Sequence, residues 1–272
     1  MREEFVSNGG GPSNDELPML KVEPRERFSS RVEHYLRFRP SYPPEVMLVL
    51  RDECALTPES VVADIASGTG LFTRLLLENG NQVFGVEPNE NMRRAGEGFL
   101  AACPRFVSVA GTAEATTLPD RSVDLITSAQ AGHWFDRERA RAEFLRILKP
   151  DSFLSLIWNE RRINDSEFER AYEELVVQYG LDYEEVQERG KRSNGAEFFA
   201  LSHCELRILS NYQDLDYAGL EGRLLSSSYI PQSGHESYDA MLADLRRMFD
   251  RYQRNGIVRV EYDTRVFFGK LS

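Results

Sequence analysis

Hydrophobic and polar positions follow two periods along this chain, one typical of strands and one typical of helices. Short apolar runs, as expected for strands buried on both faces, occur at 61–66, 82–86, 106–110, 123–128 and 153–158. Between these runs, apolar residues recur every three or four positions, as they do on one face of a helix. Strands alternating with helices predict a mostly parallel sheet with helices on both of its faces.

The second half of the chain departs from this rhythm. One helical stripe of apolar residues lies among acidic residues within 160–200, and a longer stripe runs from Tyr238 to Tyr252. A sixth strand is predicted at 206–215. At 258–268 apolar and charged residues alternate, which predicts a half-exposed antiparallel strand at the sheet edge. The predicted fold is α/β: a doubly wound, mostly parallel, seven-stranded Rossmann-like sheet with an antiparallel edge strand and helical cap insertions.

Turn-forming residues divide the chain into segments. Residues 1–24 are rich in Gly, Ser, Asn, Asp and Pro, which predicts a disordered tail. Residues 25–58 are predicted to form an N-terminal helical lid that is broken at Arg39-Pro40. Residues 59–272 then form the main domain, with cap insertions at about 160–200 and 216–253.

Composition narrows the class of protein. The chain has 33 basic and 44 acidic residues, a net charge of −11, and so argues against a nucleic-acid or anionic-membrane partner. Its 3 cysteines are far apart, which argues against a disulfide framework and fits a reducing compartment. The chain has no apolar run near the ~20 residues that span a bilayer, and no signal peptide is visible. A cytoplasmic protein is therefore expected.

The strongest chemical signal follows the first strand. The segment DIASGTG at 64–70 has small residues that let the backbone turn tightly and let a ligand approach main-chain atoms. A second acid, Glu87, ends the next strand, where a carboxylate can accept hydrogen bonds from both hydroxyls of a ribose. Together the turn and Glu87 indicate an adenosine ligand.

Asp64 discriminates between adenosine cofactors. A dinucleotide fold needs G-x-G-x-x-G because the pyrophosphate sits on the helix N-terminus, but the third glycine position here is Thr73. The carboxylate of Asp64 would also repel a pyrophosphate. It would instead suit the ammonium of S-adenosylmethionine, so this ligand is favoured over NAD.

These motifs in their order resemble those of class I S-adenosylmethionine-dependent methyltransferases. The resemblance rests on VVADIASGTGLFTRLL, VFGVEPNENM, VAGTAEATTLPDRSVDLITSAQAGHWFD and ILKP, within 61–158. The flanking segments RFRPSYP and RLLSSSYIP resemble the trans-aconitate-methyltransferase-like group of small-molecule enzymes. One departure is visible, because the first glycine of D-x-G-x-G-x-G is Ala66 here. We expect this change to shift the methionine end of the ligand slightly without abolishing binding.

The resemblance implies a set of cofactor contacts. Asp64, Ala66, Gly68 and Gly70 would border the methionine, and Glu87 would hold the ribose. The remaining implied contacts are Pro88 and Met92 near the adenine, Thr112, Ala113 and Glu114 at its edge through backbone amides and an acceptor, and Ala129 and Gln130 near the transferring methyl.

His133 and Trp134 follow the fourth strand, where side chains of such sheets meet ligands. His133 could orient or deprotonate a substrate and is the candidate catalytic residue; Trp134 could pack on the substrate or the sulfonium. In the alternative interpretation, His133 makes a structural hydrogen bond and Trp134 anchors the helix that follows.

Arginines and tyrosines outside the sheet are the other substrate candidates. A planar guanidinium can bind a carboxylate through two parallel hydrogen bonds, which would suit a small acid. The alternative is that Arg161, Arg162 and Arg223 pair with acids of the cap. Whether Arg39 contacts cofactor or substrate is left open. The substrate candidates, besides His133 and Trp134, are Tyr35, Arg39, Tyr42, Arg161, Arg223 and Tyr229.

The sequence thus predicts an enzyme that moves a methyl group from S-adenosylmethionine to a small, carboxylate-bearing metabolite and releases S-adenosylhomocysteine. No metal-ligand spacing such as C-x-x-C or H-E-x-x-H is present, so no metal is expected. A non-catalytic S-adenosylmethionine-binding protein and, less favoured, an NAD-dependent oxidoreductase are the alternatives. The acceptor, the atom methylated, the pathway and the choice between monomer and homodimer stay open.

Overall fold

The computed structural model describes residues 36–192, 195–199 and 203–271. Most of the predicted elements are present, with ends within a few residues of expectation. The strands are β1 (Val61–Ile65), β2 (Gln82–Val86), β3 (Phe106–Val109), β4 (Val123–Ala129), β5 (Leu148–Arg161), β6 (Glu205–Leu215) and β7 (Val258–Lys270). The helices are α2 (Glu45–Glu53), α3 (Leu71–Glu78), α4 (Glu90–Phe99), α5 (Arg137–Ile147), α6 (Glu167–Tyr179), α7 (Tyr183–Arg192), α8 (Tyr217–Leu225) and α9 (Tyr238–Tyr252), with short 3-10 turns η2 (Gly132–Trp134) and η3 (Gly195–Phe199).

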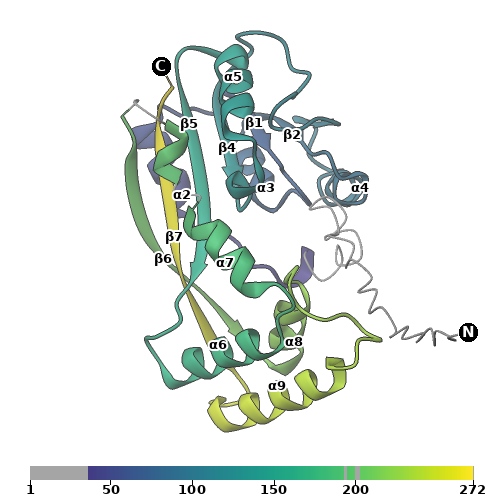
Figure 1. The fold of residues 1–272 in the computed structure, drawn as a ribbon. Helices are drawn as coiled ribbons and strands as arrows, with labels where there is room; N and C mark the ends of the chain where they lie inside the picture. Colours follow the sequence, from purple (N-terminus) through teal and green to yellow (C-terminus); the bar gives the residue numbers. More distant parts are fainter. Residues whose placement is uncertain (1–35, 193–194, 200–202, 272) are drawn as a thin grey trace, which may run out of the picture.

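The seven strands form one sheet in the order β3-β2-β1-β4-β5-β7-β6. Strands β1 to β5 pair with one another in parallel, whereas β7 is antiparallel to both β5 and β6. This arrangement confirms the predicted fold class (Figure 1).

Two details of the strand prediction are wrong. The alternating strand β7 was expected at the edge, but it lies between β5 and β6, and β6 forms the edge. Alternation of apolar and charged residues indicates only that one face of a strand is exposed to water. A strand in the interior of an antiparallel sheet can also have one exposed face, so alternation does not identify an edge strand. Strand β5 also begins at Leu148 and reaches Arg161, well beyond the apolar run at 153–158 that predicted it.

Successive side chains of the strands point to opposite faces, and each face has its own layer. Val62 packs with α2 and α3 in one core cluster, while Ala63 packs with α5 and η3 in another. The central parallel strands β1 and β4 are mostly buried on both faces for this reason.

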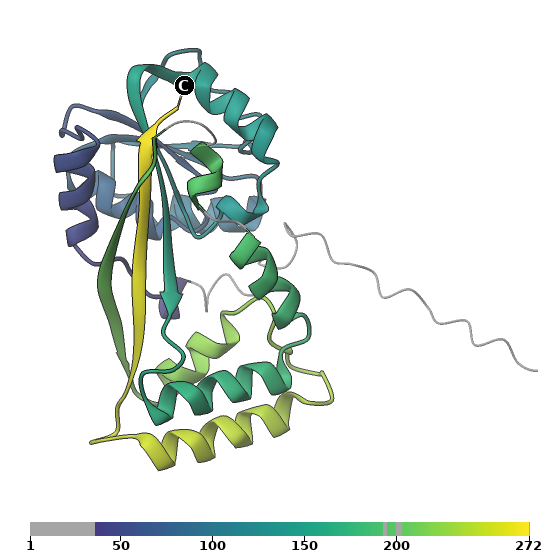
Figure 2. The same cartoon turned by 60° about the vertical axis from the view of Figure 1, so that its left-hand side comes forward.

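A third apolar cluster belongs to the cap. It joins α6, α8 and α9 to the first residues of β7, including Tyr262. Figures 1 and 2 show these helices at one end of the molecule, reached by the long strands β5, β6 and β7 that project past the rest of the sheet. The carboxyl ends of β1, β4 and β5 therefore face the cap, and the space between them can hold a ligand.

Two predicted segments fall wholly or partly outside the described residues. The tail at 1–24 and the first part of the lid, 25–35, lie there together with Tyr35. The rest of the lid comprises the helical residues 36–38, a stretch without regular secondary structure and α2. Among the described residues, no helix has the length and apolar character needed to cross a bilayer.

Candidate functional site

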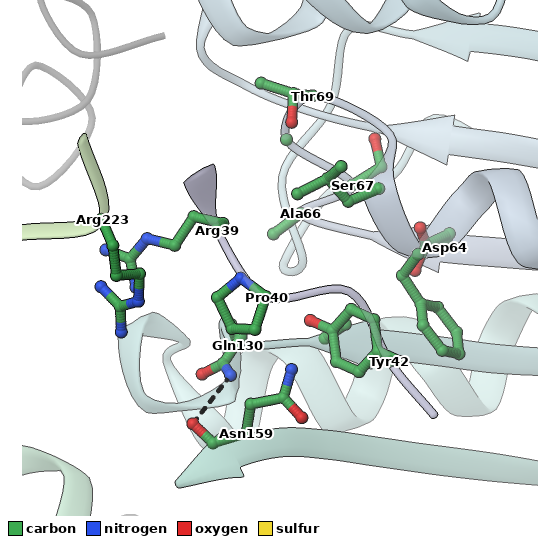
Figure 3. A pocket seen from close by; sticks show the side chains of 14 residues that line it. Arg39, Pro40, Tyr42, Asp64, Ala66, Ser67, Thr69, Gln130, Asn159 and Arg223 are labelled. Carbon is green, nitrogen blue, oxygen red and sulfur yellow. Dashed lines mark hydrogen bonds between the residues drawn. The ribbon is translucent and has the colours of Figure 1, made fainter. Parts of the chain in front are cut away.

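A pocket lies where the carboxyl ends of β1, β4 and β5 meet the cap. We call one side of it the floor, which is formed by the turn after β1, the start of α3 and the end of β4. We call its other side the roof, formed by Asn159 of β5, Arg223 of α8 and residues 39–42 (Figure 3). The lining residues are Arg39, Pro40, Tyr42, Asp64, Ala66, Ser67, Gly68, Thr69, Leu71, Phe72, Ala129, Gln130, Asn159 and Arg223.

Asp64 lies at the bottom of this pocket, with a side chain that is only 1% exposed. Thr73 donates its hydroxyl to Oδ2 at 2.6 Å, and Thr127 of β4 donates to Oδ1 at 2.9 Å. Burial raises the pKa of Asp64 to about 6, with nearby Glu87 adding to the effect and the threonine hydroxyls opposing it. A carboxylate held in this way favours a cationic partner, which would offset its desolvation.

The turn after Asp64 runs through left-handed backbone. Gly68 and Gly70 have φ of +57° and +84°, and a Cβ at Gly70 would lie 2.7 Å from Leu100 Cδ1. Ala66 has φ of +55° although it carries a side chain. Such a residue costs about 1–2 kcal/mol relative to glycine, so the departure from the family motif strains the floor directly.

Glu87 is tied to the same turn. Its Oε2 accepts from the Gly68 amide and its Oε1 accepts from the Asn89 amide, both at 2.8 Å. Met92 is buried, with its Cε 3.4 Å from where a Cβ on Gly68 would lie, and Pro88 is half-buried. Glu87, Pro88 and Met92 do not line the pocket. Glu87 and Met92 lie beside Gly68, where the adenosine part of a ligand is expected.

The adenine-edge residues stay a prediction. The backbone amide of Thr112 donates to the Ala115 carbonyl at 3.1 Å in a tight local turn. Glu114 Oε1 accepts from the Asp136 amide at 2.9 Å, and Ala113 packs in the core. A contact between Glu114 and adenine stays a prediction that would depend on the other carboxylate oxygen.

The end of β4 completes the floor. Gln130 also adopts left-handed backbone, with φ of +63°, and its Nε2 donates to the Asn159 carbonyl at 3.2 Å. Ala129 and Gln130 therefore meet Asp64 and Gly68 in one pocket, as predicted for residues near the methionine and its methyl.

The roof brings in two of the predicted lid residues. Arg39 donates to the Ser226 carbonyl at 2.9 Å, and the Tyr42 ring meets the Phe72 ring edge-on with centroids 5.0 Å apart. Figure 3 shows Arg39 and Arg223 at one end of the pocket, opposite Asp64 and Tyr42.

Arg223 is a buried cation of the pocket, with a side chain that is only 6% exposed. Its Nε donates to Tyr262 Oη at 3.1 Å and its Nη1 donates to Ser227 Oγ at 3.1 Å. Burial alone would lower the pKa of Arg223, but tyrosine hydroxyls led by Tyr262 raise it, so the guanidinium stays charged. Within the described residues, no carboxylate forms an ion pair with it.

The other cap arginines behave as the alternative interpretation expected. Arg161 pairs with Glu173 and stacks over the Tyr172 ring at 4.8 Å. Arg162 donates to Asp263 at 2.7 Å. Tyr229 stacks near Tyr183, with ring centroids 4.7 Å apart. None of these residues lines the pocket.

His133 and Trp134 lie in η2, beside the pocket rather than in its wall. Their rings contact each other, with centroids 4.7 Å apart. A catalytic role for His133 stays a prediction, and the geometry also fits the structural alternative.

The sequence interpretation missed several lining residues, of which Thr69 and Asn159 matter most. Thr69 is 1% exposed, and its Oγ1 has no hydrogen-bond partner in the described chain. A buried hydroxyl without a partner is costly, so it points to a ligand atom that completes it. Thr69 lies inside the glycine turn and Asn159 near the end of β5, and those positions were the available signals.

Residues 63–156 match the family model described as a methyltransferase domain. This stretch of the chain carries a methyltransferase domain. An uncharacterised methyltransferase of Mycobacterium tuberculosis is 42% identical over 134 residues, which are 49% of this chain and 52% of the relative. The chain therefore spans about half the length of this curated relative. An uncharacterised methyltransferase-like protein of Schizosaccharomyces pombe is 27% identical over 246 residues, 88% of this chain and 93% of the relative.

The fold of the methyltransferase domain and its cap also occurs among solved structures. A protein of Anaeromyxobacter dehalogenans, named as a type II methyltransferase, superposes with a TM-score of 0.65 over 86% of this chain and 98% of its own, at 24% identity. The resemblance to class I methyltransferases is thus confirmed. The narrower resemblance to the trans-aconitate-like group stays a prediction.

Proposed function

We propose that this protein transfers the methyl group of S-adenosylmethionine to a carboxylate oxygen of a small acid. The donor side rests on the methyltransferase domain and on groups that fit the ligand. Asp64 offers a buried carboxylate to an ammonium, and Glu87 offers one to ribose hydroxyls. Thr69 supplies a buried hydroxyl that is unpaired in the described chain and suits the methionine carboxylate.

Arg223 is the observation that carries the acceptor. A buried guanidinium without an internal carboxylate is unfavourable unless an anion from outside joins it. The pocket already holds the carboxylate of Asp64 on its floor, so the two charges can orient ligands from opposite sides. An acid bound at Arg223 would face the end of the ligand that Ala129 and Gln130 border.

The chemistry asks little of the protein beyond alignment. The donor supplies its methyl on a sulfonium that leaves as a neutral thioether. A carboxylate is already ionised, so no proton has to move. Among the described residues, the lining contains no histidine, lysine or cysteine side chain that would act as a general base. Excluding water and fixing the two reactants would therefore carry most of the rate.

The proposal also covers the partners, the location and the metal content of the enzyme. A net charge of −11 disfavours nucleic acid and anionic membranes as partners, and we propose a cytoplasmic location. No cluster of His, Cys, Asp or Glu in the described ranges could hold a metal ion, and the proposed chemistry needs none.

Two measurements test the proposal. Calorimetry should show binding of S-adenosylhomocysteine and none of NAD, since Asp64 repels a pyrophosphate. A panel of small acids, each paired with its neutral amide, should then show methyl transfer to the acids alone. Binding of S-adenosylhomocysteine without transfer to any acceptor would favour the non-catalytic alternative.

A further inference from the structure

The roof contains a segment with little regular structure of its own. Residues 38–42, which we call the strap, supply Arg39, Pro40 and Tyr42 to the pocket and connect a short helical stretch to α2. Something outside the strap must therefore fix its position.

Three amide side chains from the long strands hold the strap by its carbonyl oxygens. Gln213 Nε2 of β6 donates to the Phe38 carbonyl at 3.1 Å. Asn211 Nδ2 of β6 and Asn159 Nδ2 of β5 both donate to the Ser41 carbonyl, at 2.8 and 3.2 Å.

The amides of Asn159 and Gln213 are oriented by hydroxyl groups of β7. Asn159 Oδ1 accepts from Thr264 Oγ1 at 2.5 Å, and Gln213 Oε1 accepts from Tyr262 Oη at 2.7 Å. Since the oxygen of each amide is taken, its NH₂ group must face the strap.

The Gln213 branch continues to the buried cation. Tyr262 Oη donates to Gln213 and accepts from Arg223 Nε at 3.1 Å, and Tyr262 is fully buried. A continuous chain therefore runs from Arg223 through Tyr262 and Gln213 to the Phe38 carbonyl. It joins the cap to a strap that lies far away in sequence.

We infer that Gln213 is a positioning residue that, through Tyr262, holds Arg223 and the strap in one fixed arrangement around the acceptor. The inference rests on the proposed function for its link to the acceptor, whereas its structural part stands without any ligand. Members of such a chain polarise one another, and losing one member should release the others together.

Gln213→Glu tests this inference because it keeps the shape and the acceptor for Tyr262 but replaces the donor to Phe38 with a charged oxygen. Tyr262→Phe breaks the chain at its other link and keeps most of the side-chain volume. Gln253→Glu is the matched control, because it adds the same charge while keeping the oxygen that accepts from the Gly256 amide at 2.7 Å.

The first readout needs no ligand. Hydrogen exchange of peptides covering 38–42 should speed up at least fivefold in Gln213→Glu and in Tyr262→Phe, and should stay at the parent rate in Gln253→Glu. Equal exchange in all four proteins would overturn the inference, whatever the protein binds.

The second readout separates positioning from general damage. With the best acid acceptor, both variants should raise KM about tenfold while kcat stays within about threefold, and the double variant should be no worse than either single variant. Additive losses, or a fall in kcat alone, would show that Gln213 and Tyr262 act separately and would overturn the inference. If the parent protein methylates no acid at all, the proposed function fails while the exchange result still decides the role of Gln213.

Discussion

The floor and the roof of the pocket are built in different ways. The floor is largely one turn, 64–70, whose members are neighbours in the chain and whose backbone is left-handed at Ala66, Gly68 and Gly70. The roof collects residues from three distant segments, and the Arg39–Ser226 hydrogen bond joins positions 187 residues apart. The floor can therefore be recognised from a short sequence motif, whereas the roof forms only when distant segments meet in the folded chain.

The difference also separates two kinds of specificity. The floor offers a carboxylate and turns of backbone, which suit the donor that class I methyltransferases share. The roof offers cationic side chains on the strap and the cap, which suit the anionic acceptor that we propose. Changes in the roof should then alter acceptor use, and changes in the floor should alter donor binding.

The largest effect is expected in the roof at Arg223. Arg223→Met keeps much of the volume and removes the buried charge, so kcat/KM for the best acid should fall about 100-fold, near 2.7 kcal/mol. Arg162→Met removes a cation that is already paired with Asp263 and should stay within about twofold of the parent. Steady-state kinetics on both variants checks this, and equal losses would erase the distinction between the two arginines.

Glu87 is the matching test in the floor. Glu87→Ala removes the acceptor expected to hold the ribose and frees the Gly68 amide, so binding of S-adenosylhomocysteine should weaken by roughly 1.5–3 kcal/mol. Glu90→Ala, which removes only an exposed partner of Arg94, serves as the control. Calorimetry that finds unchanged affinity in a folded Glu87→Ala protein would remove the ribose assignment.

Asp64 should leave a signature in the pH dependence of stability. Its folded pKa of about 6 lies above the ordinary value of 3.8, so the native state binds the proton more tightly. The contribution of this group is therefore favourable below pH 4 and is lost as the pH rises through 6. The Asn side chain does not ionise, so Asp64→Asn does not lose stability in this way as the pH rises. The free energy of unfolding of the variant minus that of the parent should therefore be larger at pH 7 than at pH 5, by about 1 kcal/mol.

Urea unfolding of the parent and Asp64→Asn at both pH values measures this difference. A gap between the two proteins that does not change with pH would mean that the pKa of Asp64 is not raised. The same variant should lose donor binding at pH 7, because the ammonium would lose its carboxylate.

The smallest effect concerns Ala66. Ala66→Gly removes the strain of an alanine in left-handed backbone but makes the unfolded chain more flexible. The net gain in the free energy of unfolding should be roughly 0.5–1 kcal/mol. Thermal unfolding should show a higher Tm without a change in acceptor KM, since the roof is untouched. A lower Tm would indicate that the turn is not strained at this position.

The sequence was informative where neighbouring residues determine the outcome. Strand β2 was predicted to the residue at 82–86, because hydrophobic periodicity is a local property. The order of β7 and β6 was not, because burial alternation does not report which strand lies beside which.

The same reasoning applies to the site. Asp64 and Gly68 were found from one motif, and the pocket brings them together. Arg223 was identified only by residue type and could not be told from Arg161 or Arg162, since pairing with Glu173 or Asp263 depends on contacts across the fold. The amides of Asn159 and Gln213 carry no sequence signal, because what distinguishes them is the carbonyl they meet in the folded chain.

The measurement that tests the central claim most directly is a competition between one acid and its amide for labelled methyl groups. The labelled donor is S-adenosylmethionine, and mass spectrometry reads the two products from a single reaction. We predict that the acid is methylated in strong preference to the amide, and that Arg223→Met loses this preference. Equal methylation of both by the parent protein, or a preference that survives in Arg223→Met, would contradict an acceptor site built around the buried charge of Arg223.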